Sequence, residues 1–235
     1  FGALAGSAGA ADLVIYTSQP NEDAQATVDG FKAAHPGVDV EWVRDGTTKL
    51  MARVAAETEA GQPQADVLLI SDTVTLEGMA QAGQLAAYAS PEAVAYDASL
   101  YSAQGYYHST KLITTGIVYN TGAAEIPTSW ADLAKPEMAN LTAMPSPLYS
   151  GAALIHLATV TGTDGLGWPY YEALAANKTR AEGGNGAVFK AVAAGEKPYG
   201  VLVDYMALRA KAEGSPVGFV FPEEGVSYVT EPVAI

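Results

Sequence analysis

Short apolar segments alternate along this chain with segments of helical periodicity. Residues 13–18, Leu-Val-Ile-Tyr-Thr-Ser, form an apolar run that ends in two hydroxyls, which is typical of a buried parallel strand. The next segment, 20–34, places three apolar residues on one helical face: Ala24, Val28 and Phe31. Apolar and acidic residues then alternate over 38–42, which indicates a second strand. The continued alternation predicts an α/β fold with parallel sheets.

The alternation lapses once, between residues 86 and 110, and then resumes. This irregular segment is rich in tyrosine and contains Tyr88, Tyr96, Tyr101, Tyr106 and Tyr107. We therefore expect two α/β lobes, 12–107 and 108–222, with residues 223–235 returning to the first lobe. Polar turns at the strand ends of both lobes would face a cleft between them, where open α/β sheets bind ligands.

The amino-acid composition excludes several classes of function. The 235 residues are 49% hydrophobic, enough for a sizeable core, and the formal net charge is −14. Because nucleic-acid binding needs a basic surface, we expect no nucleic-acid partner. The chain contains no cysteine, which excludes disulfides and thiol chemistry and fits an exported bacterial protein. No apolar run approaches the roughly 20 residues that a membrane-spanning helix needs.

The first eleven residues resemble the end of a secretory signal. They are small and mostly apolar, and Ala8-Gly9-Ala10 has the pattern of a signal-peptidase site. We therefore interpret residues 1–11 as a residual leader. The sequence predicts a soluble protein that is secreted through a signal peptide to the periplasm or the cell exterior.

The turn before residue 151 offers the clearest chemistry. The segment 144–154 passes through Ser146, Ser150 and Gly151 into a small, apolar helix. The first N–H groups of a helix have no internal partner and lie at the positive end of its dipole, so such an end binds phosphate, sulfate or carboxylate. Taken alone, Ser150 is better explained as a helix N-cap than as a binding residue. Similar turns recur along the chain, and this favours a binding role.

Two other strand ends supply further candidates. Thr17 and Ser18 end the first strand, and Arg44, Gly46 and Thr47 follow the second. As structural residues they are caps and turns. As binding residues they would bring hydroxyls, backbone N–H groups and a guanidinium, which can hold an anion through two hydrogen bonds, to the cleft.

The remaining polar residues give weaker signals. Asp204 follows an apolar strand and is interpreted either as a helix N-cap or as a partner for a ligand's amine or hydroxyl groups. Three histidines lie far apart without the spacing of metal ligands: His35, His108 and His156. We expect no metal, no cofactor and no catalysis. An α/β enzyme that acts on a phosphorylated substrate is kept as an alternative.

Six segments, in this order, resemble the extracellular solute-binding proteins of ABC importers: 14–18, 64–68, 116–120, 150–152, 193–197 and 231–235. The resemblance extends over nearly all of 12–235 and is strongest to the branch of ferric-ion, 2-aminoethylphosphonate and sugar-phosphate binders. It implies a two-lobed, type II periplasmic-binding fold that closes on its ligand by a hinge motion. It also implies a monomer whose partners are a small anionic solute and an ABC permease in the cytoplasmic membrane. Members of this family usually continue for some tens of residues, so the chain looks truncated at its C-terminus.

The family's anion site matches this sequence well. In its ferric binders a Ser-Gly-Ala turn holds a synergistic phosphate, and Ser150, Gly151 and Ala152 match that turn. An asparagine that contacts the same anion is matched by Asn185. The resemblance therefore implies that the anion pocket is present here.

The family's iron ligands match poorly. Pro20 stands in place of the usual histidine, Ser71 with its neighbour Asp72 in place of an acidic residue, and Tyr205-Met206 in place of two tyrosines. We therefore expect a phosphorus-bearing organic anion, a phosphonate or a sugar phosphate. A ferric-ion binder that uses Tyr205 and a synergistic anion is the alternative.

Overall fold

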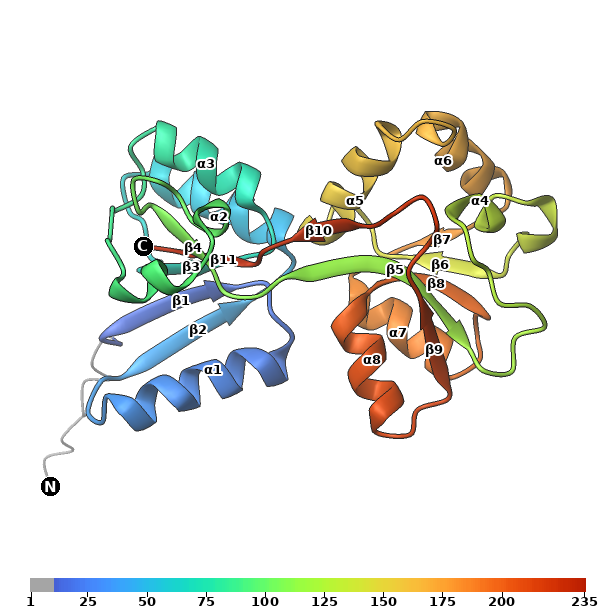
Figure 1. Cartoon of the computed structure of the whole chain (residues 1–235). Coiled ribbons are helices and arrows are strands. Elements are labelled where there is room, and N and C mark those ends of the chain that lie inside the picture. Colours follow the sequence, from blue (N-terminus) through green and yellow to red (C-terminus); the bar gives the residue numbers. More distant parts are fainter. Residues whose placement is uncertain (1–10) are drawn as a thin grey trace, which may run out of the picture.

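The computed structural model describes residues 11–235, which form two bodies that are each built on one sheet (Figure 1). The first sheet has the strand order β2-β1-β3-β11-β4. Its strands are β1 (Leu13–Thr17), β2 (Val40–Arg44), β3 (Val67–Leu69), β4 (Tyr107–Ser109) and β11 (Pro232–Ala234). Its helices are α1 (Asn21–Ala34), α2 (Thr47–Glu59) and α3 (Thr73–Gln81), with 3-10 turns at Pro91–Ala95 and Ala98–Leu100.

The second sheet has the order β10-β5-β8-β6-β7, with β9 also paired to β5. Its strands are β5 (Ile113–Asn120), β6 (Thr142–Met144), β7 (Arg180–Ala181), β8 (Tyr199–Val203), β9 (Val217–Val220) and β10 (Ser227–Val229). Its helices are α4 (Trp130–Leu133), α5 (Gly151–Thr161), α6 (Gly167–Ala176), α7 (Asn185–Ala193) and α8 (Asp204–Ala212), with a 3-10 turn at Pro136–Met138.

Strand direction is mixed in both sheets. β1 runs parallel to β2 and β3, and β6 runs parallel to β7 and β8, as the alternation of strands and helices predicts. In contrast, β11 is antiparallel to β3 and β4, and β5 is antiparallel to β8, β9 and β10. The predicted α/β class is confirmed, whereas the prediction of parallel sheets is wrong, because β5, β10 and β11 each follow the preceding strand without an intervening helix.

Two adjacent segments cross between the bodies. In Figure 1, β5 and the β10–β11 segment run side by side across the gap, and β5 pairs with β10 over 113–115. The backbone N–H groups of Thr110 and Lys111 both donate to the Thr230 carbonyl, at 3.2 and 3.3 Å. β4 pairs in the first sheet and β10 in the second, so the crossings lie at 110–112 and 230–231 rather than at the predicted positions 108 and 223.

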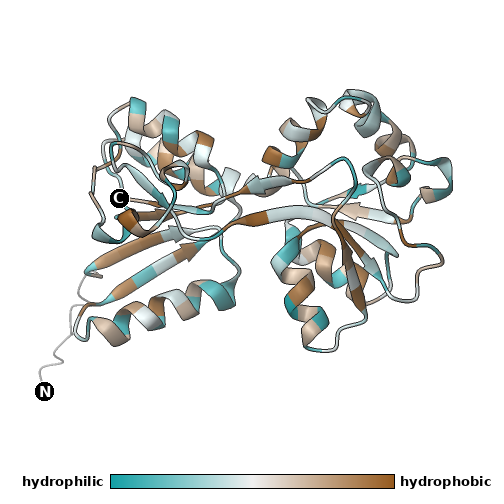
Figure 2. Cartoon of the chain, in the orientation of Figure 1, coloured by the Kyte–Doolittle hydropathy of each residue, from teal (hydrophilic) through white to brown (hydrophobic). Residues whose placement is uncertain are grey.

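Each body has its own core. In the first, Tyr16 and Ile70 are fully buried with Leu50 of α2 and Leu76 of α3. In the second, the largest cluster includes the fully buried Trp130, and a smaller cluster contains buried residues of α7 and α8. Figure 2 shows hydrophobic colour in β1 and β9 and mixed colour along the helices. Burial of separate apolar faces therefore stabilises each body on its own.

Two expectations concern membrane spans and the leader. No helix within residues 11–235 is long and apolar enough to cross a membrane. The predicted leader, residues 1–11, lies outside the described residues except for its last position. The signal-peptide assignment thus stays a prediction.

Candidate functional site

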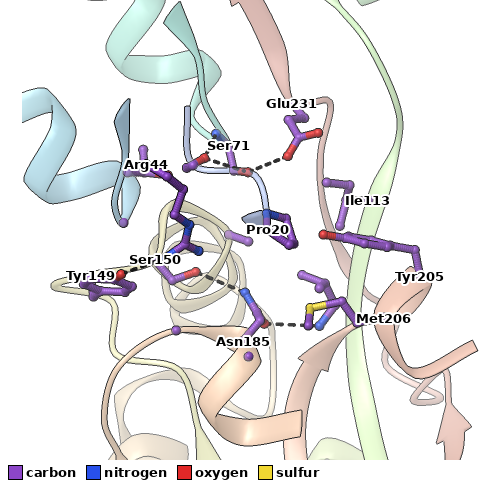
Figure 3. Close-up of a pocket in the computed structure, with 17 residues that line it drawn as sticks. Pro20, Arg44, Ser71, Ile113, Tyr149, Ser150, Asn185, Tyr205, Met206 and Glu231 are labelled. Atoms are coloured by element: carbon purple, nitrogen blue, oxygen red, sulfur yellow. Dashed lines mark hydrogen bonds between the residues drawn. The ribbon is translucent and has the colours of Figure 1, made fainter. Parts of the chain in front are cut away.

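A pocket of about 100 Å³ lies between the two bodies, where strands β1, β2 and β3 end and helices α5, α7 and α8 begin (Figure 3). The first body lines it with Ser18, Pro20, Arg44, Gly46, Thr47, Ser71 and Glu231. The second body lines it with Ile113, Tyr149, Ser150, Ala152, Gly184, Asn185, Gly186, Val203, Tyr205 and Met206. A molecule bound here would therefore contact both bodies.

Ser150 and Asn185 link the starts of two helices at one wall of the pocket. Ser150 is the N-cap of α5, and its Oγ accepts from the Ala153 N–H at 3.3 Å. The Asn185 amide also donates to Ser150 Oγ at 3.3 Å, and its oxygen accepts from the Val203 N–H at 3.3 Å. Because Ser150 Oγ accepts two hydrogen bonds, its own proton is available for a further acceptor. Cap and ligand-binding roles are thus compatible.

Besides α8, whose N-cap is Val203 and whose Tyr205 N–H donates to Asp204 Oδ1 at 2.7 Å, three other helices begin at the pocket without a side-chain cap. The N-cap residues are Pro20 for α1, Gly46 for α2 and Gly184 for α7, and none makes a side-chain hydrogen bond to its helix. In the first turns of these helices the Thr48 N–H donates to the Tyr149 carbonyl and the Ala187 N–H to the Gly184 carbonyl. The other first-turn N–H groups keep their hydrogen-bonding capacity, and each helix brings partial positive charge to the pocket. Together with α5, they form a wall suited to an anion.

Arg44 and Lys49 both contact Tyr149 at one edge of the pocket. Arg44 Nε donates to the Gln19 carbonyl at 3.0 Å, and Arg44 Nη1 donates to the Tyr149 hydroxyl at 3.1 Å. The Tyr149 ring lies below Lys49 Nζ, 5.3 Å from the ring centroid, and its carbonyl accepts from the Thr48 N–H at 3.5 Å. Tyr149 comes from the second body and the other residues from the first, so these contacts join the bodies.

Glu231 supplies a buried carboxylate beside these helix starts. Only 2% of the residue is exposed, and Lys111 Nζ lies 2.8 Å from Oε2. The Gln19 amide donates to the same oxygen at 3.1 Å, and Ser71 Oγ donates to Oε1 at 3.5 Å. The backbone of Glu231 has a positive φ of 42°, which is uncommon for a residue other than glycine. The ion pair with Lys111 compensates much of the cost of burying this charge.

Tyr205 forms another wall. Burial raises the pKa of its hydroxyl, and the nearby carboxylates of Glu231 and Asp23 raise it further. The phenol thus stays protonated at neutral pH, as a hydrogen-bond donor. Two cations face its ring, Lys111 at 4.8 Å and Arg209 at 5.5 Å from the centroid.

The structure brings nine of the predicted site residues together around the pocket: Ser18, Arg44, Gly46, Thr47, Ser71, Ser150, Ala152, Asn185 and Tyr205. The remaining predictions, Thr17, Asp72, Gly151 and Asp204, do not line it. Two of its polar residues, Tyr149 and Glu231, were missed by sequence reasoning. An acidic residue inside the apolar segment 229–235 was the available signal for Glu231.

Thr17 and Asp72 have local structural roles. Thr17 is buried, and its Oγ1 accepts from the Gln19 N–H at 3.1 Å. Asp72 is the N-cap of α3; it accepts from the Thr75 N–H at 3.0 Å and also from the Thr75 hydroxyl. Both side chains are engaged in the turns that shape the first body.

Gly151 and Asp204 support the pocket from behind. Gly151 packs against the backbone carbonyl of Ser71, in the other body. Asp204 accepts from the Thr114 hydroxyl at 2.8 Å and from the Thr114 N–H at 3.3 Å. Asp204 thus ties the start of α8 to β5 and has little capacity left for a ligand.

Comparison with known proteins places the chain in a family. The family model for bacterial extracellular solute-binding proteins matches residues 62–231. A search of curated proteins found no significant match.

Solved structures share the fold over nearly the whole chain. The periplasmic binding protein AfuA from Actinobacillus pleuropneumoniae, with exogenous fructose-6-phosphate bound, is 25% identical with a TM-score of 0.83, covering 95% of this chain and 73% of that one. Iron-bound HitA from Pseudomonas aeruginosa is 22% identical with a TM-score of 0.77, covering 95% and 74%. The substrate-binding protein of an ABC transporter from Agrobacterium tumefaciens is 17% identical with a TM-score of 0.86, covering 95% and 69%.

These findings confirm the predicted two-lobed fold of periplasmic binding proteins and the predicted family resemblance. Members of such a family bind a small-molecule solute outside the cytoplasm for an ABC permease. The chain belongs to the bacterial extracellular solute-binding proteins.

Proposed function

We propose that this chain captures a small organic anion that carries phosphorus, a phosphonate or a sugar phosphate, and delivers it to its ABC permease. The observation that carries the proposal is the anion-suited wall of the pocket, in which uncapped helix starts surround the Ser150–Asn185 pair. A phosphoryl or phosphonyl group has enough oxygens to accept from several such donors at once. AfuA, the 25% identical protein with fructose-6-phosphate bound, supports this ligand class.

The rest of the pocket suits a polar, uncharged or cationic portion of the solute. Glu231 accepts hydrogen bonds, and the protonated Tyr205 hydroxyl donates them. Hydroxyl groups of a sugar or the amine of an aminophosphonate would satisfy these residues. Inorganic phosphate or sulfate would leave them unsatisfied, so we expect either ion to bind more weakly than the organic compound.

The same residues support an organic anion over ferric iron. Fe(III) is a hard cation that prefers several anionic oxygen ligands. Among the described residues that line the pocket, Glu231 is the only one with a carboxylate. Lys111 already pairs with this carboxylate at 2.8 Å. The Tyr205 phenol is held in its protonated form by burial. Loading this site with iron would require breaking the ion pair and deprotonating the phenol.

Calorimetry and thermal unfolding test the proposal directly. The compounds are fructose 6-phosphate, 2-aminoethylphosphonate, inorganic phosphate, sulfate and Fe(III). We expect one organic phosphorus compound to bind one to one; a ligand at a hundred times its dissociation constant adds about 2.7 kcal/mol of stability. Phosphorus NMR of the released compound should show it unchanged. If no phosphorus compound binds, the proposal is wrong, and if a phosphoester is hydrolysed, the enzyme alternative replaces it.

A further inference from the structure

An ion pair outside the pocket joins the two bodies. Asp23 lies in the first turn of α1, in the first body, and Arg209 lies in the last turn of α8, in the second. Arg209 Nη1 donates to Asp23 Oδ1 at 2.9 Å. The Asp23 side chain is 14% exposed and the Arg209 side chain 53% exposed. Separation of the bodies would break this contact.

The ion pair is connected to the pocket through Tyr205. Arg209 faces the Tyr205 ring, and so does Lys111. Lys111 in turn pairs with Glu231 at 2.8 Å and lies 3.8 Å from Asp23 Oδ2. One wall of the pocket is therefore held by two cations whose carboxylate partners belong to the first body.

The geometry points to a latch. We propose that Asp23 and Arg209 are positioning residues that hold the two bodies closed around the solute and thereby set how slowly it leaves. This inference rests on the proposed function, since it concerns the regulation of the same site. The contact exists only when the bodies are together, so its free energy favours the closed state alone. Such a contact slows dissociation and leaves association nearly unchanged.

A purely structural role for Asp23 makes a different prediction. An acidic residue in the first turn of a helix is stabilised by the helix dipole whatever lies opposite. Glu22 is the neighbouring acidic residue in the same turn of α1 and is exposed. Glu22→Gln therefore removes the same charge from the same helix end without removing a partner of Arg209, and serves as the matched control.

The experiment measures both lobe separation and solute release. The chain has no cysteine, so Gln62→Cys in the first body and Asp164→Cys in the second, both exposed, carry a donor and an acceptor dye. Energy transfer is recorded for the labelled protein alone and with fructose 6-phosphate. Stopped-flow mixing gives the association and dissociation rates of that compound.

We expect Asp23→Asn and Arg209→Gln each to lower the closed fraction and to raise the dissociation rate roughly two- to fivefold, the effect of an ion pair at the protein surface. The double variant should be no worse than either single variant, because both remove the same contact. The exchange of the two charges, Asp23→Arg with Arg209→Asp, should recover most of the closed fraction. Glu22→Gln should match the parent.

The outcomes separate this inference from the proposed function. If Asp23→Asn and the parent give the same energy transfer, both alone and with fructose 6-phosphate, the latch does not exist. The same conclusion follows if Glu22→Gln changes the signal as much as Asp23→Asn does. If energy transfer in the protein alone falls in Asp23→Asn and no phosphorus compound binds the parent, the latch stands and the proposed solute class is wrong.

Discussion

Gly151, at the start of α5, packs directly against the backbone carbonyl of Ser71, two residues past the end of β3. A Cβ at position 151 would overlap that carbonyl and approach Thr47 Oγ1 to 3.0 Å. Gly46 has the same relationship to the Tyr149 carbonyl on another side of the pocket. At two points, therefore, the lobes approach so closely that there is room only for glycine.

The first prediction follows from this contact. Gly151→Ala should hold the lobes apart, because the Ser71 carbonyl cannot move aside as a flexible side chain can. Overpacking of this kind costs about 1–3 kcal/mol, and here the cost applies to the closed state. We expect affinity for the solute to fall roughly five- to 150-fold, with a larger radius of gyration in the presence of solute by small-angle scattering.

Gly78→Ala is the control, since a Cβ at that position in α3 meets nothing within 4 Å. It should leave both affinity and radius of gyration unchanged. Parent-like binding by Gly151→Ala would show that solute is held without this close contact.

The second prediction concerns the anion wall. Ser150→Ala removes a donor to the solute and the cap of α5, so a hydrogen bond to a charged group, about 1.5–3 kcal/mol, should be lost from binding. The cap itself should cost about 1 kcal/mol of stability. Calorimetry and urea unfolding measure the two effects separately. Ser146→Ala alters the same turn without lining the pocket, and its affinity should equal that of the parent.

The third prediction concerns iron. We expect Fe(III) to bind weakly or not at all, because the carboxylate of the pocket is paired with Lys111 and the Tyr205 phenol is protonated. Visible absorption after addition of Fe(III) checks this. A tyrosinate-to-iron charge-transfer band that disappears in Tyr205→Phe would contradict the prediction and restore the ferric alternative.

The fourth prediction concerns pH. Burial lowers the pKa of His156 from 6.5 to about 4. Between these values the unfolded chain binds a proton at this position and the folded chain does not, so stability rises with pH across the window. The free energy of unfolding should therefore fall by on the order of 3 kcal/mol as the pH drops from about 6.5 to 4.

Urea unfolding at several pH values measures this loss. His156→Gln should remove most of it, because the amide can still bond with Ser227, the partner of His156 Nδ1 at 3.3 Å. His35→Gln, at an exposed position, should leave the loss of stability between about pH 6.5 and 4 unchanged. An equal pH dependence in His156→Gln and the parent would assign the loss to other groups.

Local sequence patterns predicted much of the fold, because strand and helix periodicities are properties of neighbouring residues. The apolar run 13–18 corresponds to β1, Leu13–Thr17, and the helical segment 20–34 to α1, Asn21–Ala34. Strand pairing was harder to predict. β11 lies between β3 and β4, although about 160 residues separate it from β3. No local signal specifies such a neighbour.

The candidate site likewise contains some residues that could be predicted from the sequence and others that could not. Ser150 was predictable because it stands next to a helix start that the sequence itself marks, whereas Asn185 was predicted from the family resemblance. Glu231 was not, because its burial depends on Gln19, 212 positions away, and on the ion pair with Lys111. Asp72 was named from the family resemblance, and its hydrogen bond from the Thr75 N–H shows that it caps α3.

The position of β11 has a consequence for how the chain is made. β4 joins the first sheet through its pairing with β11, so that sheet cannot be completed until residues 232–234 have been synthesised. The strands of the second sheet, in contrast, are continuous in sequence from 113 to 229. Domains usually fold in the order in which they leave the ribosome. Here the sheet that begins first takes in β11 only after all the described strands of the second sheet have been made.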